Sequence, residues 1–171
     1  MNDKQNQITI KGNPLTLIGD TINVGDTAPD VELTDHNLSS VKISSFREKI
    51  CIISTVPSLD TPVCDMQTRW FNQEADKLGP DIAILVLSMD LPFAQKRWCG
   101  SAGVKKVTTL SDYKDAAFGK SYGVLIKEMH LLARALFVVD QKGVVQYIQI
   151  VKELSNEPNY DQVLKAVSGL I

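Results

Sequence analysis

The amino-acid sequence predicts a mixed α/β fold, in which helices flank a central β-sheet. Residues 50–56 and 82–88 are apolar, largely β-branched runs, typical of strands that are covered on both faces. Each run is followed by a segment with helical character, and strands that alternate with helices indicate an α/β sheet. A hairpin with strands at residues 131–139 and 144–151 is expected next, followed by an amphipathic helix at residues 159–168.

Local signals place the remaining elements. Residues 8–10 and 15–17 alternate in polarity around a turn segment, which predicts an N-terminal β-hairpin. Further strands are expected at residues 31–34, 41–43, 107–110, 131–139 and 144–151. Further helices are expected at residues 61–78, from a cap at Asp90 to Gly100 or Gly103, and at 116–122. Because no repeat or linker interrupts this order, residues 1–171 are expected to form a single domain.

Composition narrows the class of protein. The 171 residues are 44% hydrophobic and 22% charged, and a chain of this length can bury a proper core. A formal net charge of −2 gives no basic footprint for nucleic acid, so no nucleic-acid partner is expected.

The sequence predicts neither a signal peptide nor a membrane-spanning segment. Residues 1–7 are polar and lack the apolar region of a signal peptide. The longest apolar runs, at residues 82–87 and 135–139, are too short to cross a bilayer. Three cysteines do not suggest a disulfide framework. A cytoplasmic protein without a membrane partner is therefore the default expectation, with a periplasmic location as the alternative.

Cys64 is the first candidate for chemistry. It follows a buried strand in the segment VPSLDTPVC, where Thr61 suits the N-cap and Pro62 the first helical position. Cys64 then falls at the third helical position, among unpaired N–H groups at the positive end of the helix dipole. Such a site favours the nucleophilic thiolate. A small buried residue in a first helical turn explains this position about equally well.

Arg134 is the second candidate. It is the only permanent charge within a long apolar strand, at residues 131–139. An unpaired buried guanidinium is costly, so Arg134 must reach solvent or meet an anion. An arginine that extends to the sheet edge, or a structural ion pair, is the simpler explanation on its own. Beside Cys64, however, the same charge would stabilise a thiolate and a polarised peroxide oxygen.

The other two cysteines differ in their surroundings. Cys99 stands next to Gly100 near the end of a predicted helix, where the chain can fray, although a core cysteine packed behind Trp98 fits the spacing as well. Cys51 lies inside a buried strand, where cysteine behaves as a small hydrophobe, so no catalytic role is assigned to it.

Other kinds of active site are not indicated. His36 and His130 are not at ligand spacing with each other or with a cysteine, which makes a zinc site improbable. The sequence also has no Gly-rich phosphate loop, no Gly-x-Ser-x-Gly elbow and no Cys-x-x-Cys pair at Cys64.

These residues carry a family resemblance. Pro57-x-x-x-Thr61-x-x-Cys64 resembles the active-site motif of peroxiredoxins, and PSLDTPVC is similar to their bacterial thiol peroxidase branch. The resemblance covers nearly the whole chain. It includes the N-terminal hairpin and the segments DLPFAQ at residues 90–95, LARA at 132–135 and NEPNY at 156–160.

The resemblance implies a thioredoxin-like fold, no metal or organic cofactor, and a hydroperoxide substrate. Cys64 would be the peroxidatic cysteine, and Cys99 would resolve its sulfenic acid as an intramolecular disulfide. Thr61 would hold the peroxide, Arg134 would polarise it, and Pro57 would shield the sulfenic acid from water. Family members usually form homodimers and are reduced by thioredoxin. Because the two cysteines lie near the ends of different helices, both helix ends are expected to unwind locally.

Three alternatives stay open. Cys99 could be structural, with an external thiol as the resolving group. The same pair of cysteines could act as a redox sensor without significant turnover. A structural α/β domain with incidental cysteines explains Cys64 and Arg134 less well.

Overall fold

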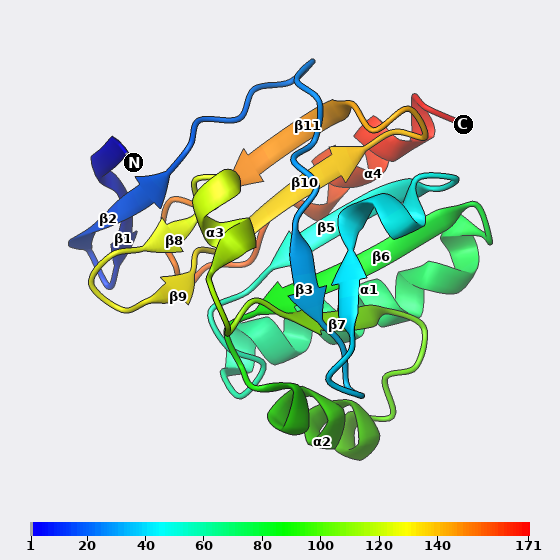
Figure 1. Cartoon of the computed structure of the whole chain (residues 1–171), viewed down its shortest axis with the longest axis horizontal. Coiled ribbons are helices and arrows are strands. Elements are labelled where there is room, and N and C mark those ends of the chain that lie inside the picture. The colour runs from blue at the N-terminus through cyan, green and yellow to red at the C-terminus, as the bar shows by residue number, and fades with distance from the viewer. Residues whose placement is uncertain (1) are drawn as a thin grey trace.

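The computed structural model describes residues 2–171, and its larger sheet forms the centre of the molecule (Figure 1). Within those residues this sheet has seven strands, in the spatial order β11 (Val145–Ile150), β10 (Ala135–Val139), β5 (Ile50–Thr55), β6 (Ile82–Ser88), β7 (Thr108–Ser111), β3 (Glu32–Thr34) and β4 (Ser40–Lys42). The pairs β5/β6 and β6/β7 are parallel, and the others are antiparallel. The predicted mixed sheet is therefore confirmed.

A smaller sheet extends the predicted N-terminal hairpin. In the described chain its order is β1 (Asn2–Ile10), β2 (Asn13–Gly19), β8 (Leu125–Ile126) and β9 (Leu131–Leu132). Ile10 pairs with Asn13 across a two-residue turn, where Lys11 and Gly12 have φ angles of 48° and 79°. Positive φ at both turn residues matches the twist of a tight hairpin.

The helices lie close to the predicted residue ranges. They are α1 (Pro62–Leu78), α2 (Pro92–Ala102), α3 (Ala117–Ser121) and α4 (Tyr160–Ser168), together with a short 3-10 helix, η1 (Ile43–Phe46). Gly103 ends α2 with a φ of 67°, the left-handed conformation that favours glycine at a helix end. No helix of residues 2–171 is long and apolar enough to cross a membrane.

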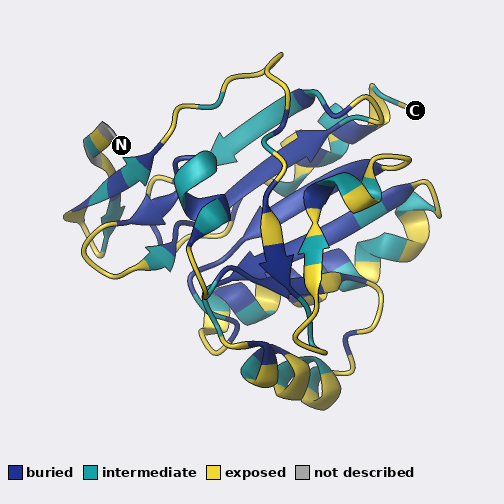
Figure 2. Cartoon of the chain, viewed as in Figure 1, coloured by how far each residue is buried: buried dark blue, intermediate teal, exposed yellow. Residues whose placement is uncertain are grey.

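The larger sheet separates two hydrophobic cores. Its central strands β5, β6 and β10 are mostly buried (Figure 2). Helices α1 and α4 cover one face, behind the sheet in Figure 1, and α3 and the hairpin cover the other. Side chains alternate along β5, so that Ile50 and Ile52 pack on the α1 side and Cys51 and Ile53 on the opposite side. Cys64 belongs to the α1 side. Cys51 and Cys64 thus lie in different cores.

The structure corrects the strand that was predicted at residues 131–139. It is divided into β9 and β10, and Arg134 lies in the break. The Ala133 N–H donates to Val124 O beside the smaller sheet, whereas Arg134 O accepts from the Val151 N–H. The chain changes from one sheet to the other at this point, which an apolar run cannot reveal.

Two other predictions need correction. Asp90 does not cap α2, whose N-cap position is Leu91, because its carboxylate faces the loop between β5 and α1 instead. Ile43 is not a strand residue, since it begins η1.

Candidate active site

Cys64 takes its place from the loop between β5 and α1. Thr61 occupies the N-cap position with an extended backbone, Pro62 begins the helix, and Cys64 is its third residue, as predicted. The Asp65 N–H donates to Thr61 O at 3.0 Å, so the helical hydrogen bonds begin after Cys64. N–H groups of the first turn have no partner within a helix, and they leave a positive end at this cysteine.

The Thr61 hydroxyl does not cap the helix. It donates a hydrogen bond of 2.8 Å to Ser58 O, and no cap bond joins its side chain to the N–H of residue 63 or 64. The hydroxyl proton is therefore held by the loop, while the lone pairs of the oxygen stay available. This geometry frees Thr61 to accept a hydrogen bond from a ligand.

Arg134 approaches Cys64 from the break between β9 and β10. Its Nη1 lies 3.5 Å from Cys64 Sγ, and both residues are almost fully buried, with 2% and 0% of their surfaces exposed. The same Nη1 donates to Gln67 Oε1 at 2.8 Å, and Nε and Nη2 donate to Leu154 O at 3.1 and 2.9 Å. The guanidinium is held from two sides, with one edge directed at the sulfur.

The charge of Arg134 lacks a protein carboxylate. Among the described residues it forms no ion pair, and the other groups that it contacts are neutral oxygens. A buried cation is strongly unfavourable without an anion. The Cys64 sulfur is the contacting group that can supply a negative charge, so the site favours a thiolate or another bound anion.

A cavity of about 230 Å³ adjoins these residues, and its surface is mostly apolar. It is lined by Ile10, Lys11, Pro57, Ser58, Thr61, Pro62, Val63, Met129, Leu131, Arg134, Leu154 and Ser155. Cys64 is not among the lining residues. A ligand in the cavity therefore meets Pro57, Thr61 and Arg134 first, while the fully buried Cys64 sulfur lies behind them.

Glu153 fixes the hairpin as one wall of this cavity. Its carboxylate accepts from the hydroxyls of Ser155 and Thr9, each at 2.6 Å, and from the N–H groups of Lys11 and Gly12. These hydrogen bonds, first that of Ser155, lower the pKa of Glu153 to about 2. The turn of the hairpin is thereby tied to the loop that carries Leu154, so both walls are held together.

Asp90 fixes the loop that holds Thr61. One carboxylate oxygen accepts from Ser58 Oγ at 2.7 Å, and the other accepts from the Leu59 N–H and from Ser88 Oγ, each at 2.8 Å. The Ser58 carbonyl in turn accepts a hydrogen bond from the Thr61 hydroxyl. Asp90 thus sets the position of Thr61 through the backbone of the loop.

Sequence reasoning missed Gln67, Asp90 and Glu153 as site residues. The sequence signal for Gln67 is its spacing, because a polar residue three positions after Cys64 falls on the same face of the helix. The structure adds that Gln67 is fully buried. Asp90 was assigned to a helix cap. Glu153 had no signal in its local sequence, since its partners at residues 9–12 belong to the other end of the chain.

Cys99 lies apart from the cavity beside Cys64. It is half-buried in α2 and lines a separate groove of about 510 Å³, and its Sγ lies 3.5 Å from Thr109 Oγ1. Burial raises the pKa of the Cys99 thiol, and the hydrogen bond with Thr109 partly opposes this effect. Cys51, Cys64 and Cys99 are all free thiols here. The structure thus brings Pro57, Thr61 and Arg134 together around Cys64, but not Cys99.

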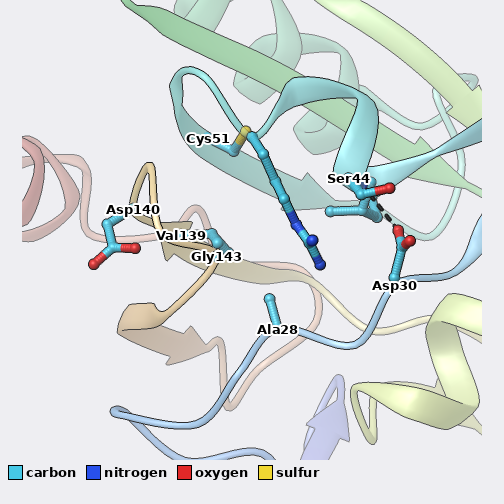
Figure 3. A pocket seen from close by; sticks show the side chains of 9 residues that line it. Ala28, Asp30, Ser44, Cys51, Val139, Asp140 and Gly143 are labelled. Carbon is cyan, nitrogen blue, oxygen red and sulfur yellow. Dashed lines mark hydrogen bonds between the residues drawn. The ribbon is translucent and has the colours of Figure 1, made fainter.

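Cys51 is buried in β5, as predicted, and the structure places it on the face of the sheet opposite Cys64. It borders a small cavity that Ala28, Val139 and Gly143 also line (Figure 3). Its Sγ donates to Phe46 O at 3.5 Å, and burial raises the pKa of this thiol to about 11. Both features disfavour the thiolate form of Cys51.

No group of three or more His, Cys, Asp or Glu residues within residues 2–171 is arranged to hold a metal ion.

Comparison with known proteins identifies relatives over nearly the full chain. Residues 23–164 match the model of the Redoxin family. The thiol peroxidase of Bacillus subtilis (strain 168) is 49% identical over 165 residues, which cover 96% of this chain and 98% of that protein.

Solved structures agree with the sequence match. A peroxiredoxin-like protein from Aquifex aeolicus has a TM-score of 0.91 and 40% identity, with all of both chains covered. The thiol peroxidase from Chromobacterium violaceum has a TM-score of 0.85 over 95% of each chain, and its 22% identity supports the fold alone.

Proposed function

The chain belongs to the thiol peroxidase subfamily of the peroxiredoxins, within the Redoxin family, and we propose that Cys64 is its peroxidatic cysteine and Cys99 its resolving cysteine. It has the thioredoxin-like peroxiredoxin fold, and it is a peroxidase. The observation that carries the assignment of Cys64, at the start of α1, is its 3.5 Å contact with Arg134, which forms no ion pair within the part of the chain that the structure describes.

The first step is attack of the Cys64 thiolate on one peroxide oxygen. A bond between sulfur and oxygen forms, the O–O bond breaks, and the departing oxygen takes up a proton from solvent to leave as water or an alcohol. Cys64 becomes a sulfenic acid. Negative charge moves from the sulfur onto the departing oxygen, and the Arg134 guanidinium and the first-turn N–H groups can stabilise it along this path.

Thr61 and Pro57 have supporting roles in this step. Because the Thr61 proton is held by Ser58 O, its oxygen can accept the O–H of a hydroperoxide and orient it. Pro57 is buried and lines the same cavity, where it can exclude water from the sulfenic acid. The mostly apolar walls suit the organic part of a hydroperoxide, so we include organic hydroperoxides with hydrogen peroxide as substrates.

The second step is attack of Cys99 on the Cys64 sulfenic acid, which forms an intramolecular disulfide and releases water. A disulfide needs its two Cα atoms within about 7 Å of each other. Cys64 is fully buried in the core and Cys99 lines a different groove, so both helix ends must unwind locally. Thioredoxin, acting by thiol–disulfide exchange, would then restore the two thiols.

The remaining parts of the proposal concern the whole protein. Residues 1–171 would act as one thioredoxin-like domain, which forms a homodimer in the cytoplasm. The family resemblance supports the homodimer, and the low cysteine content is in keeping with a reducing compartment.

A redox sensor would use the same two cysteines without significant turnover, and a turnover assay separates the two functions. Peroxide loss is followed with thioredoxin in excess and protein far below the peroxide concentration. We expect many turnovers by the wild type and by Cys51→Ser. Loss of at most one peroxide per chain would support the sensor instead.

The Cys99→Ser variant tests the resolving cysteine in the same assay. We expect one rapid turnover and then no steady turnover with thioredoxin. Steady turnover at the wild-type rate would mean that an external thiol resolves Cys64, and that Cys99 is structural.

A further inference from the structure

Cys99 is joined to His36 through the hydroxyl of Thr109. The Thr109 Oγ1 lies 3.5 Å from Cys99 Sγ and 2.5 Å from His36 Nε2. The three residues come from different parts of the fold: the turn between β3 and β4, helix α2 and strand β7. Thr109 is almost fully buried, with 4% of its surface exposed. A hydroxyl can accept one proton while it donates another, so with His36 in its Nδ1–H tautomer this arrangement can pass a proton from the thiol to the imidazole.

The surroundings of His36 favour its neutral form. Burial is the main cause that lowers the pKa of His36, and Lys96 adds to this effect while Asp35 opposes it. Lys105, on the loop after α2, is the other charged residue among those that line the same groove. A histidine with a pKa below its usual value of about 6.5 is an available base at neutral pH.

We propose that His36 acts as the base for the resolving cysteine, through Thr109 as a proton relay. The proposal rests on the assignment of Cys99 as the resolving residue, and it adds two residues to that step. Thr109 touches the reacting sulfur, whereas His36 acts through Thr109 and is a positioning residue. Neither residue contacts the cavity beside Cys64.

The relay completes the proton balance of the second step. The Cys99 S–H gives its proton to Thr109 Oγ1, the Thr109 proton passes to His36 Nε2, and the electron pair stays on sulfur. The Cys99 thiolate then attacks the sulfenic sulfur of Cys64, so that an S–S bond forms and the S–O bond breaks. The leaving hydroxide takes a proton from the imidazolium or from solvent and departs as water.

The test separates the two chemical steps in a single turnover. Sulfenic acid at Cys64 is trapped with a dimedone reagent, and disulfide formation is followed by rapid acid quench and mass spectrometry over a range of pH. In the wild type we expect the rate of disulfide formation to rise up to the pKa of His36 and to be level above it. For His36→Gln and Thr109→Val we expect the rate at pH 7 to fall at least about tenfold and to keep rising with pH.

Two controls keep the result specific. Thr109→Ser retains the hydroxyl and should restore the wild-type pH profile, and His130→Asn, which alters the other histidine, should leave it unchanged. A wild-type pH profile in both His36→Gln and Thr109→Val would overturn the relay alone, provided that Cys64 still forms sulfenic acid. Absence of sulfenic acid in the wild type would overturn the proposed function and the relay with it.

Discussion

The Trp98 indole N–H donates a hydrogen bond of 3.0 Å to Asp65 Oδ1, and this contact joins the helix of Cys64 to the helix of Cys99. Arg69 strengthens the junction. It forms an ion pair with Asp65 at 2.8 Å, donates to Ala102 O at 3.2 Å, and lies over the Trp98 ring at 5.7 Å. Asp65 follows Cys64 and Trp98 precedes Cys99, so the junction holds both helix segments whose unwinding the proposed disulfide requires.

Loss of the Trp98 hydrogen bond should speed disulfide formation. Trp98→Phe keeps an aromatic ring but removes the N–H donor, so the folded dithiol form loses about 0.5–1.5 kcal/mol of stabilisation. We expect disulfide formation after a peroxide pulse to be roughly two- to tenfold faster. Trp70→Phe is the matched control, since Trp70 stacks on Tyr160 instead. A slower or unchanged rate in Trp98→Phe would show that this junction does not restrain the movement.

Gln67 should control the reactivity of Cys64 through Arg134. Gln67→Met removes the acceptor of the Arg134 Nη1 hydrogen bond at nearly constant volume. Hydrogen bonds to charged groups contribute about 1.5–3 kcal/mol, so we expect sulfenic acid formation to slow by roughly 10- to 100-fold. Ser54→Ala removes only the partner of the Gln67 amide N–H, and it should change the rate far less. Stopped-flow measurement of the rate of Cys64 oxidation tests this prediction. Equal rates in Gln67→Met and the wild type would contradict the role of Gln67 in holding Arg134 beside Cys64.

Asp90 should affect peroxide binding through the loop between β5 and α1, which carries Thr61. Asn has one acceptor oxygen in place of two, so Asp90→Asn must weaken its bonds to Ser58, Leu59 or Ser88. We expect the KM for hydroperoxide to rise about tenfold, a loss of about 1.4 kcal/mol. Asp60→Asn changes an exposed carboxylate on the loop between β5 and α1, and it should leave the KM near the wild-type value. Equal KM values in Asp90→Asn and Asp60→Asn would contradict the role of Asp90 in positioning Thr61.

Cys51 should be protected by folding. Its pKa is raised to about 11 by burial, so the native protein keeps a neutral thiol there at pH 8. We expect iodoacetamide to modify Cys51 only after unfolding, as peptide mapping can show. The pKa of Cys51 in the folded protein lies above its unfolded value of about 8.5. The contribution of the neutral Cys51 thiol to the free energy of unfolding is therefore fully present below pH 8.5 and is lost as the pH rises towards 11. Rapid modification of native Cys51 at pH 8 would contradict this prediction.

The elements that carry Cys64 were predictable because their signals are local. The apolar run of β5, the Thr61-Pro62 start and the Gly79 end together fixed the extent of α1 and the position of Cys64 in its first turn. The requirement that Arg134 meet an anion also followed from one sequence position and the cost of a buried charge.

The partners of these residues were not predictable in the same way. Gln67 and Arg134 are 67 positions apart, and Thr9 and Glu153 are 144 positions apart. Such pairs depend on how the two sheets pack, which no local pattern encodes. The break at Arg134 was missed for the same reason, because β9 and β10 are both apolar and differ only in the sheet that they join.

Peroxide consumption in a single turnover tests the role of Cys64 most directly. Reduced wild type, Cys64→Ser and Cys51→Ser are each mixed with an equal amount of hydrogen peroxide, without thioredoxin, and the remaining peroxide is measured over time. We predict that wild type and Cys51→Ser consume the peroxide rapidly and that Cys64→Ser consumes none above the rate without protein. Consumption by Cys64→Ser at the wild-type rate would contradict the assignment of Cys64 as the peroxidatic cysteine.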